Sequence, residues 1–337
     1  MILVTGGTGL VGAHLLVALV NNGKKVRAIH RASSDLEAVK NVFSYDTNKV
    51  ATLFNKIEWM IADITDINTL EAAFKNIEYV YHCAAYISFN PRHYPVLKKV
   101  NIEGTANVVN FCLTEGVKKL CYISSIATLG KTTDGSLSTE ETEFNPEEDN
   151  SVYAITKHEA EMQVWRGTQE GLDAIIVHPG VIIGEGVWSS ASGGIFRTIS
   201  KGLHYYTPGG VSIVDVKDVV KAMISLTTST IKNEAYILVA KNIYYKELLT
   251  KISVSLNKKP PNKTIAKWMM ISVVNLDWLL YKVFRIKRKL LKATVRSLYK
   301  TSFYDASKIK EVLGFKFTPS DKMIERVARN YRKDFKF

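Results

Sequence analysis

The chain has 337 residues, of which 46% are hydrophobic and 23% are charged, and this composition excludes a disordered, a collagen-like or a disulfide-stapled protein. The net charge of +13 is unevenly distributed, because residues 241–337 hold 24 Lys and Arg against 7 Asp and Glu. A chain of this length is expected to form two domains, or one large core with a smaller lobe.

The first 180 residues alternate short β-rich runs with helical runs. The β-rich runs contain many Val, Ile and Tyr residues and little polar alternation, which is typical of strands buried on both faces. This alternation predicts the α/β class, with a parallel sheet covered by helices on both sides. The predicted strands are Ile2–Thr5, Lys25–His30, Ile57–Ile61, Tyr79–His82, Leu120–Ser124 and Ala174–His178, and the predicted helices are Val11–Asn21, Ile67–Phe74, Tyr94–Glu115 and Tyr153–Glu170.

A glycine-rich turn joins the first predicted strand to the first predicted helix. Gly6 permits the tight turn, Gly9 lets the backbone approach a pyrophosphate, and Gly12 lets the helix pack closely on the strand. The first helical amides, at Leu10 and Val11, then face the phosphates with the partial positive charge of a helix N-terminus. This context favours a dinucleotide-binding site, and a tight turn without a ligand is the alternative.

The ends of the next two predicted strands bear on the choice between NAD and NADP. No Asp or Glu ends the second strand, where a carboxylate would bind the ribose 2′-hydroxyl of NAD. Arg31 can instead pair with a 2′-phosphate, assisted by Arg27, which favours NADP; the alternative is a surface Arg31 that stacks on the adenine of NAD. Asp63, followed by Ile64, is placed to accept a hydrogen bond from the adenine amino group, whereas Asp66 is expected to cap the next helix.

Three further motifs follow in the chain: Asn101-Ile102-Glu103-Gly104-Thr105, Tyr122-Ile123-Ser124-Ser125 and Tyr153-Ala154-Ile155-Thr156-Lys157. With the glycine-rich turn they resemble the extended short-chain dehydrogenase/reductase family, and the resemblance covers essentially the whole chain. It implies a doubly wound, Rossmann-type dinucleotide-binding domain over residues 1–180, to which residues 211–240 return. Residues 181–337 would form a smaller mixed substrate lobe with basic C-terminal helices.

The resemblance also assigns roles to individual residues. Ser125, Tyr153 and Lys157 match the catalytic positions, with Ser124 as the alternative to Ser125. Asn101 matches an asparagine on the helix beside the cofactor. The remaining implied cofactor contacts are Cys83, Ala84 and Ala85 in the loop over the adenosine and nicotinamide riboses, and Pro179 and Ile182 on the nicotinamide side.

Tyr153 and Lys157 are four residues apart and therefore share one helix face. A free tyrosine has a pKa of about 10 and is a poor acid or base at neutral pH. We expect the Lys157 ammonium and an oxidised nicotinamide to favour the phenolate, so that Tyr153 exchanges a proton with a substrate oxygen. Ser125 would hydrogen-bond the same oxygen, and Lys157 would also hold the nicotinamide ribose.

Residues beside these motifs discriminate among the reactions of the family. Its dehydratases carry an Asp-Glu pair after the catalytic Ser or Thr, and residues 126–128 supply none; its sugar-nucleotide epimerases usually carry Asn where this chain has His178. Residues 176–184 are instead similar to the dihydroflavonol reductase and 3β-hydroxysteroid dehydrogenase branch. We therefore predict an oxidoreductase that interconverts a carbonyl and a secondary alcohol. A nucleotide-sugar epimerase using bound NAD is the first alternative, and a non-catalytic NAD(P)-binding regulatory protein is the second.

The segment from Lys267 to Phe284 is apolar, but Asn275, Asp277 and Lys282 make it too polar for a membrane span. We expect a pair of helices that cap the substrate pocket, which would suit a hydrophobic small-molecule substrate. The alternative is a peripheral membrane contact through residues 267–292, with Trp side chains in the lipid and a basic run on anionic headgroups. No nucleic-acid partner is expected, because no reading module accompanies the charge. Relatives often form homodimers.

The three cysteines, Cys83, Cys112 and Cys121, lie in apolar surroundings and lack the spacing of a zinc site. We interpret them as reduced core thiols and expect no metal. The chain begins Met-Ile-Leu-Val-Thr-Gly-Gly, without the basic region or the long apolar run of a signal peptide, so a cytoplasmic location is expected.

Overall fold

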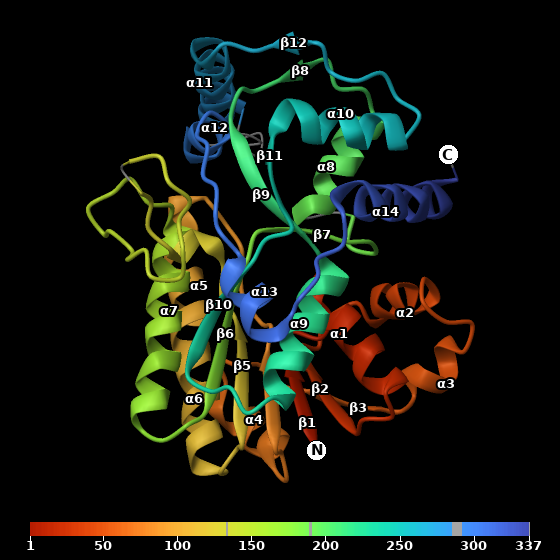
Figure 1. Ribbon diagram of the computed structural model, residues 1–337, viewed down its shortest axis with the longest axis vertical. Coiled ribbons are helices and arrows are strands. Elements are labelled where there is room, and N and C mark those ends of the chain that lie inside the picture. The colour runs from red at the N-terminus through yellow and green to blue at the C-terminus, as the bar shows by residue number, and fades with distance from the viewer. Residues whose placement is uncertain (133, 189–190, 285–291, 337) are drawn as a thin grey trace.

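The computed structural model describes residues 1–132, 134–188, 191–284 and 292–336. Within these ranges a seven-stranded sheet runs in the order β10-β6-β5-β4-β1-β2-β3, with helices on both faces (Figure 1). Every neighbouring pair in it is parallel, which confirms the predicted α/β class. The strands are β1 (Ile2–Thr5), β2 (Val26–His30), β3 (Ile57–Ile61), β4 (Tyr79–His82), β5 (Lys119–Ile123), β6 (Ala174–Pro179) and β10 (Glu234–Leu238).

The two faces of this sheet bury two separate apolar clusters. Successive strand residues point to opposite faces, so Leu3 belongs to one cluster and Val4 to the other. The helices α1 (Leu10–Asn21) and α9 (Val216–Thr228) contribute to the cluster of Val4. The cluster of Leu3 is built with α4 (Ile67–Phe74), α6 (Gly104–Thr114) and α7 (Val152–Gln169).

The strand order reverses between β1 and β4, which are hydrogen-bonded to each other at the centre of the sheet. The chain builds outward from β1 to β3, then returns and builds outward again from β4 to β6. Ligands of open α/β sheets bind at the carboxyl ends of the strands beside such a reversal. The glycine-rich turn and the Ser125 motif both follow carboxyl ends of strands, so this edge is where a site is expected.

The predicted helix Tyr94–Glu115 is present but interrupted. It consists of α5 (Tyr94–Leu97), a π-helical segment (Lys98–Glu103) and α6. Two short helices, α2 (Leu36–Ser44) and α3 (Val50–Phe54), cover the region between β2 and β3, for which the sequence predicted no element.

A smaller lobe lies above the large sheet in the view of Figure 1. Its three-stranded sheet has the order β11-β9-β7, and β10 leaves the lobe to join the large sheet. The strands of the lobe are β7 (Val181–Ile183), β9 (Gly210–Asp215) and β11 (Lys241–Tyr244), with β8 (Tyr205–Tyr206) paired to β12 (Lys263–Thr264). Its helices are α8 (Ala191–Ser200), α10 (Tyr245–Ser255), α11 (Lys267–Phe284), α12 (Lys292–Leu298) and α14 (Ser320–Phe335). Helix α13 (Ser307–Leu313) instead packs against β10 of the large sheet.

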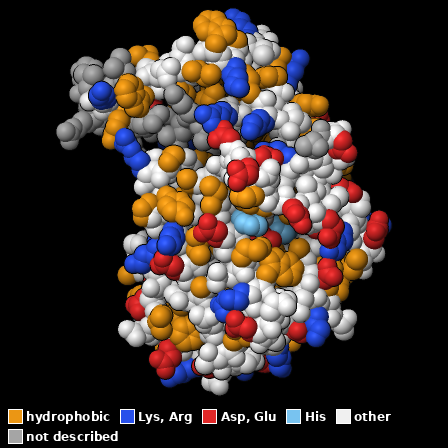
Figure 2. Space-filling view, turned by 90° about the vertical axis from the view of Figure 1, so that its left-hand side faces the viewer, with side chains coloured by type: hydrophobic (Ala, Val, Ile, Leu, Met, Phe, Trp, Pro, Cys, Tyr) orange, Lys and Arg blue, Asp and Glu red, His pale blue; other side chains and the backbone are white. Residues whose placement is uncertain are grey.

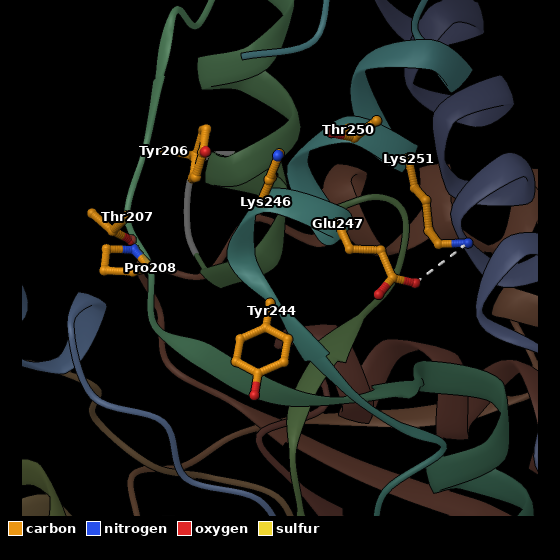
Figure 3. A pocket seen from close by; sticks show the side chains of 8 residues that line it. All are labelled: Tyr206, Thr207, Pro208, Tyr244, Lys246, Glu247, Thr250 and Lys251. Atoms are coloured by element: carbon orange, nitrogen blue, oxygen red, sulfur yellow. Dashed lines mark ion pairs between the residues drawn. The ribbon is translucent and has the colours of Figure 1, made fainter. Parts of the chain in front are cut away.

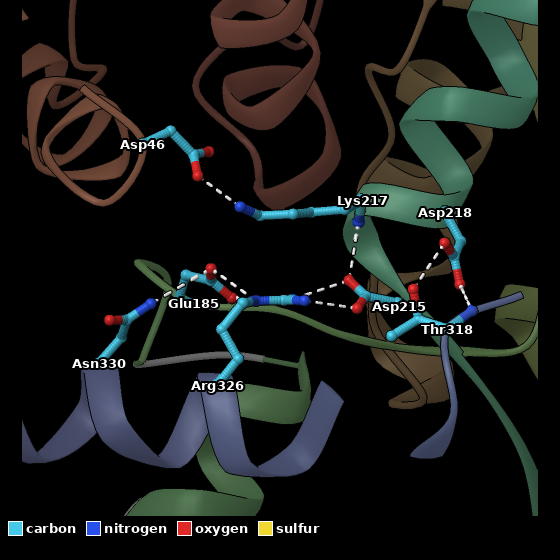
Figure 4. Close-up of polar contacts among 8 residues, drawn as sticks. All are labelled: Asp46, Glu185, Asp215, Lys217, Asp218, Thr318, Arg326 and Asn330. Carbon is cyan, nitrogen blue, oxygen red and sulfur yellow. Dashed lines mark hydrogen bonds and ion pairs between the residues drawn. The ribbon is translucent and has the colours of Figure 1, made fainter. Parts of the chain in front are cut away.

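A buried charge cluster joins the last helix to the rest of the molecule (Figure 4). Arg326 of α14 donates to both oxygens of Asp215, at 2.6 and 2.7 Å, and to Glu185, at 3.1 and 3.2 Å. Both carboxylates are fully buried, and Asp215 also caps α9 by accepting from the amide of Lys217. The imidazole of His14, on the glycine-turn helix, bonds the backbone carbonyl of Glu185. The cluster therefore fixes α14, β9 and α1 to one another.

In the part of the chain that the structure describes, no helix is both long and apolar enough to cross a membrane. The three cysteines are free thiols, and Cys112 and Cys121 are buried.

Candidate active site

The glycine-rich turn leaves no room for side chains. Gly6 has φ = +67°, and a Cβ atom there would lie 2.5 Å from the backbone nitrogen of Ala84. A Cβ at Gly12 would lie 2.2 Å from the carbonyl oxygen of Gly6. Helix α1 begins after Gly9, which makes no side-chain capping bond, and its first turn contains no acidic residue. The amides of this helix N-terminus thus form a cradle of the kind that binds a dinucleotide pyrophosphate.

The loop after β4 passes directly over this turn. The amide of Cys83 bonds the carbonyl of Thr5, and the amide of Ala84 lies 3.3 Å from the Thr5 hydroxyl. Next to it, both ring nitrogens of His82 contact threonine hydroxyls, Thr5 at 2.6 Å and Thr105 at 3.0 Å. Burial lowers the pKa of His82 to about 3, so this imidazole is neutral and ties β4 to β1 and α6.

The two arginines of the second strand have different surroundings. Arg31 follows β2 and is exposed at the carboxyl edge of the sheet. Arg27 is buried, and its guanidinium donates to Glu58 at 2.9 Å and to the carbonyls of Ala73 and Lys75. The expectation that Arg27 assists Arg31 is therefore wrong, because its donors hold β2 to β3 and to the end of α4.

The two aspartates after β3, Asp63 and Asp66, accept hydrogen bonds from different groups. Asp63 is half-buried, and its Oδ1 accepts from the amide and hydroxyl of Thr65. Asp66 caps α4 by accepting from the amide of Asn68, which confirms the predicted cap. Ile64, between them, is buried and lies against Gly104 at the start of α6.

The adjacent serines after β5 point in different directions. Ser124 is buried and donates to Glu161 at 2.5 Å. Ser125 is only half-buried and caps the following 3₁₀ turn through the amide of Ala127. Of the two serines, Ser125 is the one whose side chain lowers the pKa of Tyr153.

Tyr153 stands in the first turn of α7, where Ser151 caps the helix. The ring of Phe89 meets it edge-on, with 5.7 Å between ring centroids. Burial raises the pKa of Tyr153 to about 12, and Ser125 lowers it only in part. Without a cofactor the phenol therefore holds its proton at neutral pH, and the effect of Lys157 together with an oxidised nicotinamide stays a prediction.

Lys157 lies one turn further along α7, fully buried. Its ammonium donates to the Tyr122 hydroxyl at 2.7 Å and to the carbonyl of Ile123 at 2.6 Å, and it lies 4.2 Å from the centre of the Tyr122 ring. Burial lowers the pKa of Lys157 to about 7, against the opposing effect of Glu161. Lys157 is thus held at the end of β5, close to the predicted catalytic serine.

A buried polar network that lies beneath these residues was not predicted from the sequence. One oxygen of Glu161 accepts from Ser124 at 2.5 Å, from Thr128 at 2.9 Å and from Nε2 of His178 at 2.9 Å. Burial alone would raise the pKa of Glu161, but His178 and the two hydroxyls outweigh it and lower the pKa to about 2. The four-residue spacing from Lys157 was the available signal, since it places Glu161 on the same face of α7.

The remaining predicted cofactor contacts at this edge of the sheet are Asn101 and two residues near the end of β6. Asn101 is buried in the π-helical segment, where it bonds both backbone groups of Tyr86 and donates to Thr156 of α7. It thus holds the loop after β4 against the helix that carries Tyr153. Pro179 is buried at the end of β6, and Ile182 is half-buried in β7.

A cavity of about 680 Å³ lies elsewhere, in the smaller lobe (Figure 3). It is bordered by tyrosines and lysines, and the proposed catalytic residues do not line it. Its lining residues are Tyr206, Thr207, Pro208, Tyr244, Lys246, Glu247, Thr250 and Lys251. Among the described residues, no group of three or more His, Cys, Asp or Glu side chains is placed to hold a metal ion.

Comparisons with known proteins agree with this fold. The model of the NAD dependent epimerase/dehydratase family matches residues 2–238. A putative dihydroflavonol 4-reductase of Synechocystis sp. is 27% identical over 92% of this chain and 88% of its own. A UDP-glucose 4-epimerase of Vibrio cholerae is 29% identical over 60% of this chain and 57% of its own. The crystal structure of gox2253 superposes with a TM-score of 0.82, at 28% identity, covering 99% of this chain and 98% of that one.

Proposed function

Because the chain belongs to the NAD dependent epimerase/dehydratase family, we propose that it is an NAD(P)-dependent oxidoreductase that interconverts a carbonyl and a secondary alcohol. The observation that carries this proposal is the position of Ser125, Tyr153 and Lys157 at the carboxyl edge that also bears the glycine cradle, with Lys157 bonded to the Ile123 carbonyl at the end of β5. A relative named as a reductase spans nearly the whole chain, which supports the same reaction class.

In this proposal Tyr153 is the general acid of carbonyl reduction. With a pKa near 12 the phenol holds its proton at neutral pH and can donate it to the substrate oxygen. Ser125 would hydrogen-bond the same substrate oxygen and orient it toward the phenol. NADPH or NADH, when bound, supplies the hydride. Lys157, held by Tyr122 and the Ile123 carbonyl one turn further along α7, would bind the nicotinamide ribose.

The glycine cradle and the loop after β4 would hold the cofactor. Gly6, Gly9 and Gly12, with the amides of Leu10 and Val11, would bind the pyrophosphate. The remaining contacts proposed are Arg31, Asp63 and Ile64 on the adenosine side, and Cys83, Ala84, Ala85, Asn101, Tyr153, Lys157, Pro179 and Ile182 toward the nicotinamide.

We propose NADP as the preferred cofactor, because Arg31 is exposed at the end of β2 and the strand ends without a carboxylate. Fluorescence titration of the protein with NADPH and NADH tests this choice. Tighter NADPH binding that is lost in Arg31→Ala, with NADH binding unchanged, is the expected result. Equal affinities, or tighter NADH binding, would contradict the role of Arg31.

The epimerase alternative draws on the Vibrio cholerae relative and on the family. It requires Tyr153 to begin as a base that removes a proton from an alcohol, which the proposed oxidoreductase also requires in the oxidation direction, so the tyrosine does not separate the two functions. Mass spectrometry of a co-purified ligand separates the two readings, since an epimerase would carry a nucleotide sugar and a reductase an apolar ketone or alcohol. We further propose a hydrophobic substrate, and a homodimer formed through the outer faces of α6 and α7.

Substitution of the catalytic residues tests the reaction itself, with oxidation of NADPH by a panel of apolar ketones as the assay. Tyr153→Phe should lower turnover about 10²- to 10⁴-fold while cofactor affinity is retained. Lys157→Ala should lower both turnover and cofactor affinity. Ser125→Ala should lower turnover, whereas its neighbour Ser124→Ala should mainly lower stability, because Ser124 bonds the buried Glu161. Near-full activity of Tyr153→Phe would refute the assignment of the site.

A further inference from the structure

Helix α11 exposes an unusually apolar surface. Along its 18 residues the fully buried side chain among those described is Val274, and Met270, Asp277 and Tyr281 are half-buried on the same stripe. A helix on a protein surface normally turns its apolar stripe inward and its polar residues outward. Here the outward residues include seven large apolar side chains: Trp268, Met269, Ile271, Val273, Leu276, Trp278 and Leu280.

Several of these side chains are strongly exposed. Trp268 is 70% exposed, Leu276 is 56% exposed and Trp278 is 45% exposed. The two tryptophans are ten residues apart, which is about 15 Å along a helix, so both ends of the apolar surface carry an aromatic ring. Tryptophan is the residue that membrane interfaces prefer, because its ring is apolar and its N–H needs a polar partner.

Positive charge surrounds this apolar surface. Lys267 begins α11 and Lys282 lies near its end, where its ammonium is 5.3 Å from the Trp278 ring centre. The chain continues with a basic sequence that lies outside the described residues, and Arg296 follows on α12. On the face of the molecule that carries α11, apolar and cationic side chains lie together in the upper part (Figure 2).

We propose that α11 docks this protein on the surface of an anionic lipid bilayer. The helix would lie in the plane of the interface, with its outward apolar side chains below the headgroups and its cations against the lipid phosphates. This orientation agrees with the finding that, within the described ranges, no helix can cross a membrane. The docking does not depend on which reaction the site performs.

The positive charge around α11 favours an anionic bilayer over a second copy of the chain as the partner. Residues 267–300, which include α11 and α12, hold nine Lys and Arg against one Asp, so two copies joined through α11 would bring like charges together. The same charge strengthens binding to an anionic lipid surface, by about 1 kcal/mol for each Lys or Arg near that surface.

The docking helix also borders the proposed active site. The Arg92 guanidinium donates to the Tyr281 hydroxyl at 2.8 Å and lies 5.1 Å from the centre of its ring. Arg92 follows Phe89, whose ring meets Tyr153. On the other side, Arg296 of α12 pairs with Asp149, just before α7. The bilayer would therefore lie beside the entrance to the site.

Co-sedimentation of the full-length protein with lipid vesicles tests the docking. We expect binding to vesicles that contain phosphatidylglycerol, little binding to pure phosphatidylcholine, and weaker binding at high salt. Trp268→Ser should weaken binding about tenfold, because it removes a large apolar contact with the lipid. Val273→Ser should weaken it less, and Val254→Ser, an exposed valine on α10, should leave it unchanged.

Three results would overturn the proposal. The first is equal binding of the wild-type and Trp268→Ser proteins to phosphatidylglycerol vesicles. The second is a loss of binding in Val254→Ser as large as that in Trp268→Ser. The third is a lipid-free dimer, seen by analytical ultracentrifugation, that Trp268→Ser dissociates, because α11 would then be an interface between two copies. Circular dichroism of each variant shows whether the fold is retained.

Discussion

The buried ammonium of Lys157 makes the stability of the free protein depend on pH in a specific range. Its pKa is lowered by burial from 10.5 to about 7, a difference that corresponds to about 5 kcal/mol at 1.36 kcal/mol per unit. Between pH 7 and pH 10.5 the unfolded chain keeps the Lys157 proton and the folded chain loses it. The unfolded state therefore binds more protons, and the free energy of unfolding rises with pH.

Lys157→Met removes this contribution and nearly preserves the length of the side chain. Urea unfolding at pH 7, 8 and 9 should show that the wild type gains about 2 kcal/mol relative to Lys157→Met across this range. Titrations of other groups are common to both proteins and cancel in the difference. The control is Lys322→Met, an exposed lysine on α14, which should follow the wild-type pH dependence. If the free energy of unfolding changes with pH in the same way for the wild type and Lys157→Met, then Lys157 does not titrate in this pH range.

Three further substitutions test the framework of the site. Gly12→Ala should abolish cofactor binding in a fluorescence titration, because its Cβ would lie 2.2 Å from the Gly6 carbonyl oxygen. Glu161→Gln should lower the free energy of unfolding by about 2 kcal/mol at pH 7, since the amide leaves a buried donor unpaired. The pKa of Glu161 is lowered from 4.5 to about 2, so the wild-type advantage should be complete above about pH 5 and lost as the pH falls toward 2. Arg326→Met should cost about 3 kcal/mol in urea unfolding, because the buried Asp215 carboxylate loses its cation.

Much of the large sheet could be predicted from the sequence, because each strand is a local apolar run. The six predicted strands are present, with ends within one residue of those observed. The seventh, β10, was not predicted, although residues 235–238 form a similar apolar run. Helix α2 carries a local signal that was overlooked: Asp35 caps it, and Val39, Val42 and Phe43 form its buried face.

The candidate site was predictable where function depends on local spacing. The glycine turn and the Tyr153–Lys157 pair are each contained in one short segment. The environment of each group was not predictable, because it depends on side chains from other elements. Arg27 illustrates this: the sequence places it on the cofactor strand, but its partners come from β3 and α4.

Glu161 partly offsets the unfavourable burial of the Lys157 ammonium. Its carboxylate raises the pKa of Lys157 and so opposes the effect of burial on the ammonium. The same carboxylate is bonded to Ser124, which orients the strand end that carries Ser125. One buried acid thus acts on both the charge of the lysine and the position of the serine. The effect on the lysine follows from the four-residue spacing along α7, whereas the effect on the serine does not, because the serines lie at the end of β5.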